Sequence, residues 1–246
     1  MKKLLIILVM AVLGTGCAAP RERGVVPTVY DSIEQTNRGI YYFNENVFDY
    51  IHYPITSAYN YIVPGFVRLR LYRFFDNLSE LGTIVNSVLQ LKLSNAAATT
   101  GRFIVNSTIG IGGLFDVATD MGLTRDRERF NNVLATYGVA EGPMVTIPLM
   151  IPVSTRTAVG FVGDFFLDPL YFIIPRTIGR DVTEYYVYAG LNGLVVTSVA
   201  AEYMDQVRAS NPDSYDTIIT YSRMAEYAHL DGLEITDMRP EQVKTE

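Results

Sequence analysis

The chain has 246 residues, with 20 basic against 26 acidic side chains and a formal net charge of −6 at pH 7. This acidic balance (pI about 5.0) argues against nucleic-acid binding, because Lys and Arg must neutralise the phosphates of a nucleic acid. Hydrophobic residues make up 49% of the chain, and the mean hydropathy of +0.16 is higher than a water-soluble domain needs.

Residues 1–16 have the form of a secretory signal peptide. Lys2 and Lys3 precede an unbroken apolar run over 4–13, and small residues follow it. The run is too short to span a bilayer, which takes about 20 apolar residues. Removal of residues 1–16 leaves 18 basic and 26 acidic side chains, a formal charge of −8.

Cys17 follows directly and is the only cysteine, so no internal disulfide is possible. The residues before it, Leu-Gly-Thr-Gly, resemble a bacterial lipobox, although the leucine lies four rather than three positions before the cysteine. We predict that Cys17 carries a covalent diacylglycerol and an N-acyl chain and starts a lipidated tether over 17–29. The alternative is an ordinary signal peptide followed by a free thiol, which is unusual in an exported protein.

Helical spacing dominates the next segments. Ile40, Phe43, Val47 and Ile51 recur on one helix face, which Pro54 is expected to interrupt. A second apolar stretch, 63–75, carries three arginines that are candidates for phospholipid headgroup contacts, because guanidinium groups bind phosphate well. The alternative is a solvated helix face. These arginines are Arg68, Arg70 and Arg73.

A two-faced helix is predicted after residue 80. Its apolar stripe consists of Leu81, Ile84, Val85 and Val88. The opposite face is polar but uncharged and holds Thr83, Asn86, Ser87 and Gln90. A helix over 95–105 is followed by a glycine-rich break at 110–113, which matches no phosphate-binding fingerprint. The alternating charges of 125–129 indicate an exposed segment.

The rest of the chain is predicted to hold turns and short extended pieces over 137–157, then helices near 158–172, 181–209 and 212–230. A polar tail covers 232–246. No mature segment is expected to span a bilayer, because Asp164 and Asp168 interrupt the apolar stretch 158–175. A mainly α, apolar and acylated chain of this kind is typical of proteins in the membrane interface.

The sequence shows no catalytic or metal-binding pattern. Asp116 and Asp120, like Asp164 and Asp168, are four residues apart, but such pairs more often cap helices than catalyse. The only histidines are His52 and His229, and the nucleophile-elbow and zinc-protease motifs are absent from the sequence. We expect no enzyme activity, no metal and no cofactor.

Four strings of the chain resemble the MlaA/VacJ lipoproteins of Gram-negative outer membranes. The most specific part is G-R-F-x-x-N-S-T-x-G-x-G-G-x-F-D-x-A over 101–118. The strings are NRGIYYFNENVFDYIHYPI (37–55), VNSVLQLKLSNAAATTGRFIVNSTIGIGGLFDVA (85–118), RFNNVLATYGVAEGPMVTIPL (129–149) and DFFLDPL (164–170). The chain departs from the family pattern at 31–34, 130–135 and 151–157.

The resemblance implies a ring-like single domain of amphipathic helices over 30–231, anchored in the periplasmic leaflet of the outer membrane. It implies a non-enzymatic protein that moves mislocalised phospholipids from the outer leaflet through an amphipathic channel to a periplasmic lipid carrier, beside a trimeric porin. Such a protein maintains the lipid asymmetry of the outer membrane. The candidate channel-lining residues are Thr83, Asn86, Ser87, Gln90 and Asn106.

Two other functions stay open. One is a structural or assembly lipoprotein that docks on a porin without translocating lipid. The other is a lipid-modifying enzyme that uses serine or aspartate side chains.

Overall fold

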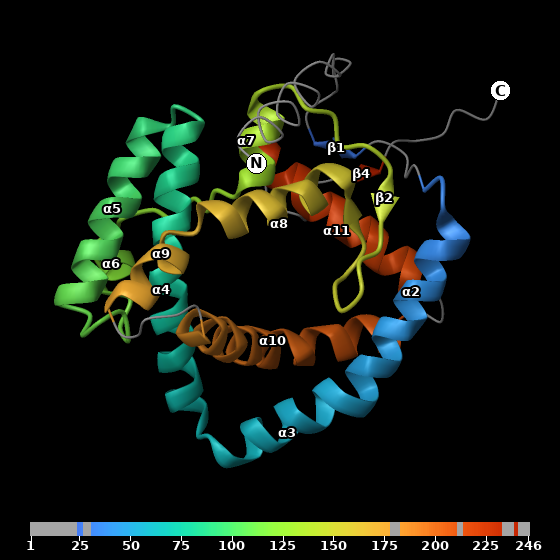
Figure 1. Cartoon of the computed structure of the whole chain (residues 1–246), viewed down its shortest axis with the longest axis horizontal. Coiled ribbons are helices and arrows are strands. Elements are labelled where there is room, and N and C mark those ends of the chain that lie inside the picture. Colours follow the sequence, from blue (N-terminus) through green and yellow to red (C-terminus); the bar gives the residue numbers. More distant parts are fainter. Residues whose placement is uncertain (1–23, 27–30, 178–182, 211–213, 233–238, 241–246) are drawn as a thin grey trace. The chain divides into compact units, whose positions relative to one another are not determined.

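The computed structural model describes residues 24–26, 31–177, 183–210, 214–232 and 239–240 (Figure 1). The signal peptide, Cys17 and most of the predicted tether lie outside these residues. The chain forms two compact units. The first comprises Met1–Tyr50, Leu134–Val159 and Gln206–Glu246, and the second comprises Ile51–Val133 and Gly160–Asp205.

In the residues that the structure describes, the first unit contains two whole helices and two small sheets. Helix α2 (Glu34–Val47) and helix α11 (Ser214–Asp231) are its long elements. Strand β1 (Val25–Val26) pairs in parallel with β4 (Arg239–Pro240), and β2 (Met144–Val145) pairs antiparallel with β3 (Val153–Ser154). A small apolar core joins Val26 to Tyr227 and Ala228 of α11.

Asn37 fastens α2 to the β2 region within this unit. Its side-chain amide donates to Asp31 Oδ1 (2.7 Å) and to the carbonyl oxygen of Met144 (2.9 Å), and its Oδ1 accepts from the N–H of Thr146 (2.9 Å). The side chain is 1% exposed. Both the donor and the acceptor groups of this buried amide are thus satisfied, as burial of a polar side chain demands.

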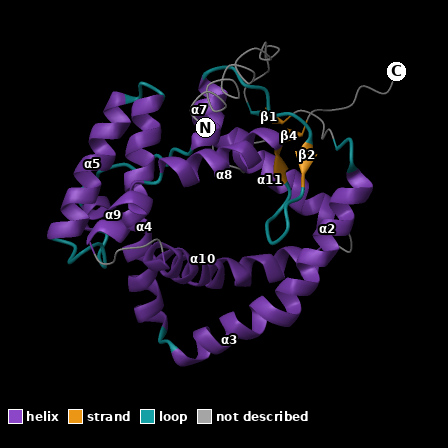
Figure 2. Ribbon diagram, viewed as in Figure 1, coloured by secondary structure: helices purple, strands orange, loops and turns teal. Residues whose placement is uncertain are grey.

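In its described residues, the second unit consists of helices joined by loops, without a strand (Figure 2). It contains α3 (Tyr53–Ile62), α4 (Gly65–Leu89), α5 (Leu93–Thr108), α6 (Val117–Asp120) and α9 (Pro169–Thr177). Four helical elements hold residues of both units: a π-helical turn (Phe48–His52), α7 (Phe130–Thr136), α8 (Thr155–Leu167) and α10 (Thr183–Ser210).

The mainly α prediction is confirmed, with two local differences. Pro54 does not end the helical segment: it is the second residue of α3, and the π-helical turn directly before it is a local adjustment of the kind that accommodates a proline. The helix predicted near 158–172 is two helices, since α8 ends at Leu167 and the Asp168 carboxylate accepts the N–H of Leu170 in the first turn of α9 (2.9 Å).

The stretch Thr155–Ile174 is long and apolar enough, by length and composition, to cross a membrane, with a mean hydropathy of 1.5. We expected no mature segment of this kind, because Asp164 and Asp168 interrupt the stretch, and this expectation is wrong on those two criteria. Length and composition alone do not distinguish a spanning helix from one that lies in an interface.

Helix α4 buries its polar face and leaves its apolar stripe half exposed. Thr83, Asn86 and Ser87 are at most 6% exposed, whereas Val88 is 47% exposed. The same inversion is strongest where α3 ends and α4 begins, since Tyr61 is 92%, Ile62 75% and Phe66 71% exposed. A water-soluble helix shows the opposite arrangement, so these helices are built for an apolar surrounding.

The hairpin of α4 and α5 is held together by a buried charge network. The Arg102 side chain is 1% exposed, and its guanidinium contacts Glu80 Oε1 (3.4 Å), Asp116 Oδ1 (3.0 Å) and the carbonyl oxygen of Leu123 (2.6 Å). Arg125 also pairs with Glu80 (3.1 Å). Burial raises the pKa of Glu80 although both arginines oppose this.

Asp116 joins this network to the glycine-rich turn. Burial alone would raise the pKa of Asp116, but hydrogen bonds from Thr119 and Asn106 and the charge of Arg102 together lower it to about 2. The Asn106 amide donates to Asp116 Oδ1 (3.0 Å), and its Oδ1 accepts the N–H of Ala118 (2.9 Å). Arg102, Asn106 and Asp116 of the 101–118 motif thus have structural roles in this network.

The glycine-rich turn offers a matched pair of substitutions. Gly112 and Gly113 both have positive φ (69° and 90°), but a Cβ at Gly113 would lie 2.6 Å from Asn77 Cβ, whereas a Cβ at Gly112 meets nothing within 4 Å. Gly112→Ala should cost about 1–2 kcal/mol through its backbone, and Gly113→Ala about 1–3 kcal/mol more through overpacking. Denaturant unfolding followed by circular dichroism measures the difference, and equal losses would contradict the close approach to Asn77.

Candidate functional site

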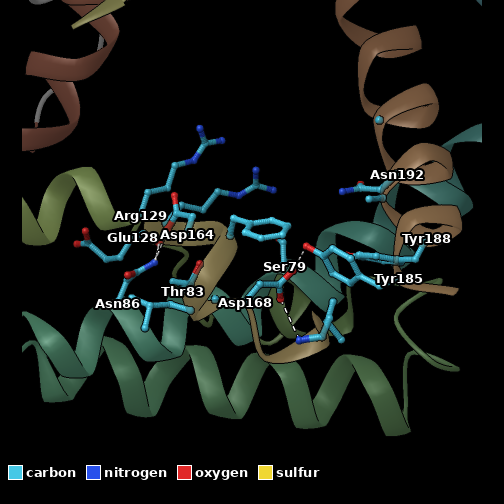
Figure 3. A pocket seen from close by; sticks show the side chains of 17 residues that line it. Ser79, Thr83, Asn86, Glu128, Arg129, Asp164, Asp168, Tyr185, Tyr188 and Asn192 are labelled. Atoms are coloured by element: carbon cyan, nitrogen blue, oxygen red, sulfur yellow. Dashed lines mark hydrogen bonds between the residues drawn. The ribbon is translucent and has the colours of Figure 1, made fainter. Parts of the chain in front are cut away.

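A pocket of about 400 Å³ lies within the second unit (Figure 3). One wall is the polar face of α4, another is the segment that leads into α7, and the remainder comes from α8, α9 and α10. Its polar lining consists of Ser79, Thr83, Asn86, Arg127, Glu128, Arg129, Asp164, Asp168, Tyr185, Tyr188 and Asn192.

Two of the five predicted channel-lining residues, Thr83 and Asn86, line this pocket. The side-chain amide of Asn86 donates to Asp164 Oδ1 (3.0 Å) and to the carbonyl oxygen of Glu128 (3.3 Å). This pair of bonds ties α4 to α8 and to the segment before α7.

The other three predicted residues are buried but do not line the pocket. Ser87 accepts a hydrogen bond from Asn95 (2.9 Å), Gln90 donates to Glu128 Oε2 (2.8 Å), and Asn106 belongs to the Asp116 network. Their role in a channel stays a prediction, and the bonds found here are structural.

The surroundings of Asp164 disfavour the ionised form of its carboxyl group. Its Oδ1 accepts the N–H of Phe130 (2.8 Å) in addition to the bond from Asn86. Burial raises the pKa of Asp164, against the effect of these bonds and of Arg129, and the nearby charge of Asp168 raises it further. The ionised form is therefore held at a cost in stability.

Asp168 faces two tyrosines of α10. The hydroxyl of Tyr185 donates to Asp168 Oδ2 (2.9 Å; Figure 3). Burial and the Asp168 charge raise the pKa of Tyr188 to about 12, and burial together with the Asp168 hydrogen bond and charge raises the pKa of Tyr185. Both hydroxyls consequently remain protonated at neutral pH.

Three consecutive charged residues, Arg127, Glu128 and Arg129, line the pocket. Arg127 pairs with Asp76, and Glu128, which is 2% exposed, pairs with Lys92. Within the described residues the guanidinium of Arg129 has no ion pair or hydrogen bond, although its charge acts on Asp164. The expectation of an exposed segment at 125–129 is wrong for Glu128, because buried amides and Lys92 solvate its carboxylate.

The three arginines predicted to bind headgroups lie on α4 and do not line the pocket. Arg68 donates to Asn60 Oδ1 (2.7 Å), and Arg70 lies over the ring of Phe115, 4.0 Å from its centroid. Arg73 is half-buried, with no hydrogen bond or ion pair to any described residue. Their headgroup role stays a prediction.

Sequence reasoning missed Arg129, Tyr185, Tyr188 and Asn192. Asp164 and Asp168 were noticed as a pair, but nothing in their spacing indicates that α10 brings tyrosines and an asparagine to the same pocket. The residues that line the pocket are spread along the chain from Ser79 to Gly193, and periodicity does not predict which of them the fold brings together.

Asp164→Asn should stabilise the protein at neutral pH, because asparagine keeps the accepting oxygen and loses the buried charge. The raised pKa of Asp164 makes wild-type stability fall as the pH rises above the ordinary value of 3.8. The advantage of the variant should therefore vanish near pH 4 and reach a few degrees in melting temperature at pH 7. Thermal unfolding at both pH values measures it, and a destabilised variant at pH 7 would contradict the assignment.

The described fold and pocket define a mainly helical protein with a partly open pocket, lined by polar and apolar side chains, and exposed apolar side chains on several helices. A family model described as MlaA lipoprotein matches residues 29–226. The chain therefore belongs to the MlaA lipoprotein family.

Individual relatives agree with this assignment. An uncharacterized protein of Rickettsia prowazekii is 37% identical over 146 residues, which is 58% of each chain. The intermembrane phospholipid transport system lipoprotein MlaA of Escherichia coli K12 is 35% identical over 159 residues, 63% of each chain. The chain thus spans about three-fifths of the length of the curated relatives it matches.

A solved structure supports the fold. It is described as the structural basis for maintenance of bacterial outer membrane lipid asymmetry, and it matches with a TM-score of 0.61 and 28% identity. The match covers 82% of this chain and 98% of that chain.

Proposed function

We propose that this protein is a non-enzymatic outer-membrane lipoprotein that moves mislocalised phospholipids from the outer leaflet to a periplasmic carrier and so maintains lipid asymmetry. The observation that carries the proposal is the two-faced helix α4, whose buried polar residues Thr83 and Asn86 line a pocket while Val88 faces outward. The names of the relatives point in the same direction.

The energetics explain why such an arrangement suits lipid transfer. Pulling a two-chain phospholipid wholly into water exposes about 30 methylenes, at a total cost on the order of 25 kcal/mol. A headgroup that crosses bare hydrocarbon meets a steep electrostatic barrier. A polar lane for the headgroup beside an apolar surface for the tails lowers both costs without chemical work.

The anchor and the partners belong to the same proposal. Acyl chains on Cys17 would hold the protein in the periplasmic leaflet, since two lipid chains suffice for stable anchoring. The exposed Tyr61, Ile62 and Phe66 would lie among the acyl chains of the bilayer. A ring-like arrangement of the helices, a trimeric porin neighbour and a periplasmic carrier complete the proposed route.

Substitutions at two glycines of α10 distinguish a block of the pocket from a general effect on the helix. Gly193 lines the pocket and Gly190 does not, and a Cβ at either meets nothing within 4 Å. Gly193→Leu should slow transfer of a fluorescent phospholipid from vesicles bearing the lipidated protein to the carrier by about tenfold or more, because the side chain occupies the pocket. Gly190→Leu should leave the rate near that of the wild type.

The same assay tests the other two functions. A wild-type protein that binds the porin without transferring lipid would support a docking scaffold instead. Recovery of lyso-lipid or free fatty acid would support an enzyme. Equal transfer rates in the two glycine variants would contradict a path through this pocket.

A further inference from the structure

Some charged residues of the pocket lining are neutralised by ion pairs, and others are not. Arg127 is neutralised by Asp76, and Glu128 is neutralised by Lys92. The remaining charged groups of the lining are the cation Arg129 and the two carboxylates Asp164 and Asp168. With both acids ionised, these three groups carry a net charge of −1.

This charge set disfavours a ligand that is only anionic. A second negative charge would add to the repulsion that already acts between Asp164 and Asp168, an effect visible in the raised pKa of Asp164. A ligand with one phosphate and one amine brings no net charge, so it can satisfy Arg129 without increasing that repulsion.

Each end of such a ligand has a partner of the right chemistry. Among the residues that the structure describes, none forms a hydrogen bond or ion pair with the Arg129 guanidinium, and its fork matches two phosphate oxygens. An ammonium group donates three hydrogen bonds, and carboxylates accept them well. Asp168 retains accepting capacity beyond its bonds from Tyr185 and Leu170.

We infer that the pocket recognises a zwitterionic phospholipid headgroup with a primary amine, of the phosphoethanolamine class, with its phosphate at Arg129 and its ammonium at Asp168. The inference deepens the proposed function and rests on it for the identity of the ligand as a lipid. It assigns to the pocket a preference over anionic lipids and over quaternary amines, which have no N–H to donate.

Lipid retention measures this preference without any transfer step. The full-length lipidated protein is equilibrated in detergent with equal amounts of dioleoyl phosphatidylethanolamine, phosphatidylglycerol and phosphatidylcholine, repurified, and its bound lipids are quantified by mass spectrometry. We expect roughly tenfold enrichment of phosphatidylethanolamine over phosphatidylglycerol, the range for a charge-assisted hydrogen bond, and a smaller enrichment over phosphatidylcholine.

Substitutions that remove one charge each test which residue binds the ammonium and which binds the phosphate of the headgroup. Asp168→Asn should bring the ethanolamine-to-glycerol ratio close to one, and Arg129→Gln should lower retention of all three lipids. Asp120→Asn removes the same charge as Asp168→Asn at a position outside the pocket, and it should behave as the wild type. If Asp168→Asn fails to fold, Asp164→Asn, which keeps its hydrogen-bond acceptor, should reduce the ratio in the same direction.

Three results would overturn the inference: equal retention of the ethanolamine and glycerol lipids by the wild type, a preference that survives both aspartate variants, or equal loss in the Asp120→Asn control. Failure of the proposed function looks different. Selective retention without transfer to the carrier would leave headgroup recognition intact and remove translocation, whereas transfer without selectivity would remove only the inference drawn here.

Discussion

The structure of the second unit depends on buried hydrogen bonds to charged groups, because many of its apolar side chains are on the outside. Arg102 is the clearest case, since its guanidinium reaches Glu80, Asp116 and the Leu123 carbonyl oxygen from a site that is 1% exposed. Removing one partner of such a set leaves a charge unpaired in a low-dielectric site, which typically costs about 3–5 kcal/mol. Among the described residues, polar side chains such as Asn77, Thr83 and Ser87 occupy positions that leucine or valine would hold in a water-soluble helical protein.

The same helix, α4, connects this network to the pocket. Asn77 and Glu80 contribute to the hairpin with α5, and one turn further on Thr83 and Asn86 line the pocket. A rigid polar face of this kind offers a headgroup fixed dipoles, so that little reorganisation is needed when the ligand arrives. The half-exposed apolar stripe of α4 leaves space for acyl chains at the other side of the helix. The same pattern of one polar and one apolar face on α4 therefore serves both the stability of the unit and the proposed transport.

The sequence predicted what local periodicity determines. The polar face opposite Leu81, Ile84, Val85 and Val88 was recognised from spacing, and its burial is confirmed. The glycine-rich break and the short extended pieces near 144–154 were also predicted. The partners of Gln90, Asn106 and Glu128 were not, because each is satisfied by residues that only the tertiary fold brings near. The break between α8 and α9 at Asp168 was not predicted for a similar reason. In the sequence, an aspartate within an apolar run can lie on one face of a continuous helix, and only its hydrogen bond to the N–H of Leu170 shows that it caps a new helix.

The central claim is that the exposed apolar side chains contact lipid rather than water. The chain contains no tryptophan, so Tyr61→Trp introduces a single tryptophan, whose emission can be excited selectively, at a position that is 92% exposed in the protein. In vesicles that contain phospholipids brominated along their acyl chains, the account predicts blue-shifted emission that the bromines quench strongly. Phe75→Trp, at a site only 7% exposed, should be blue-shifted but weakly quenched. Water-like emission from Tyr61→Trp, unchanged by the brominated lipids, would contradict the account.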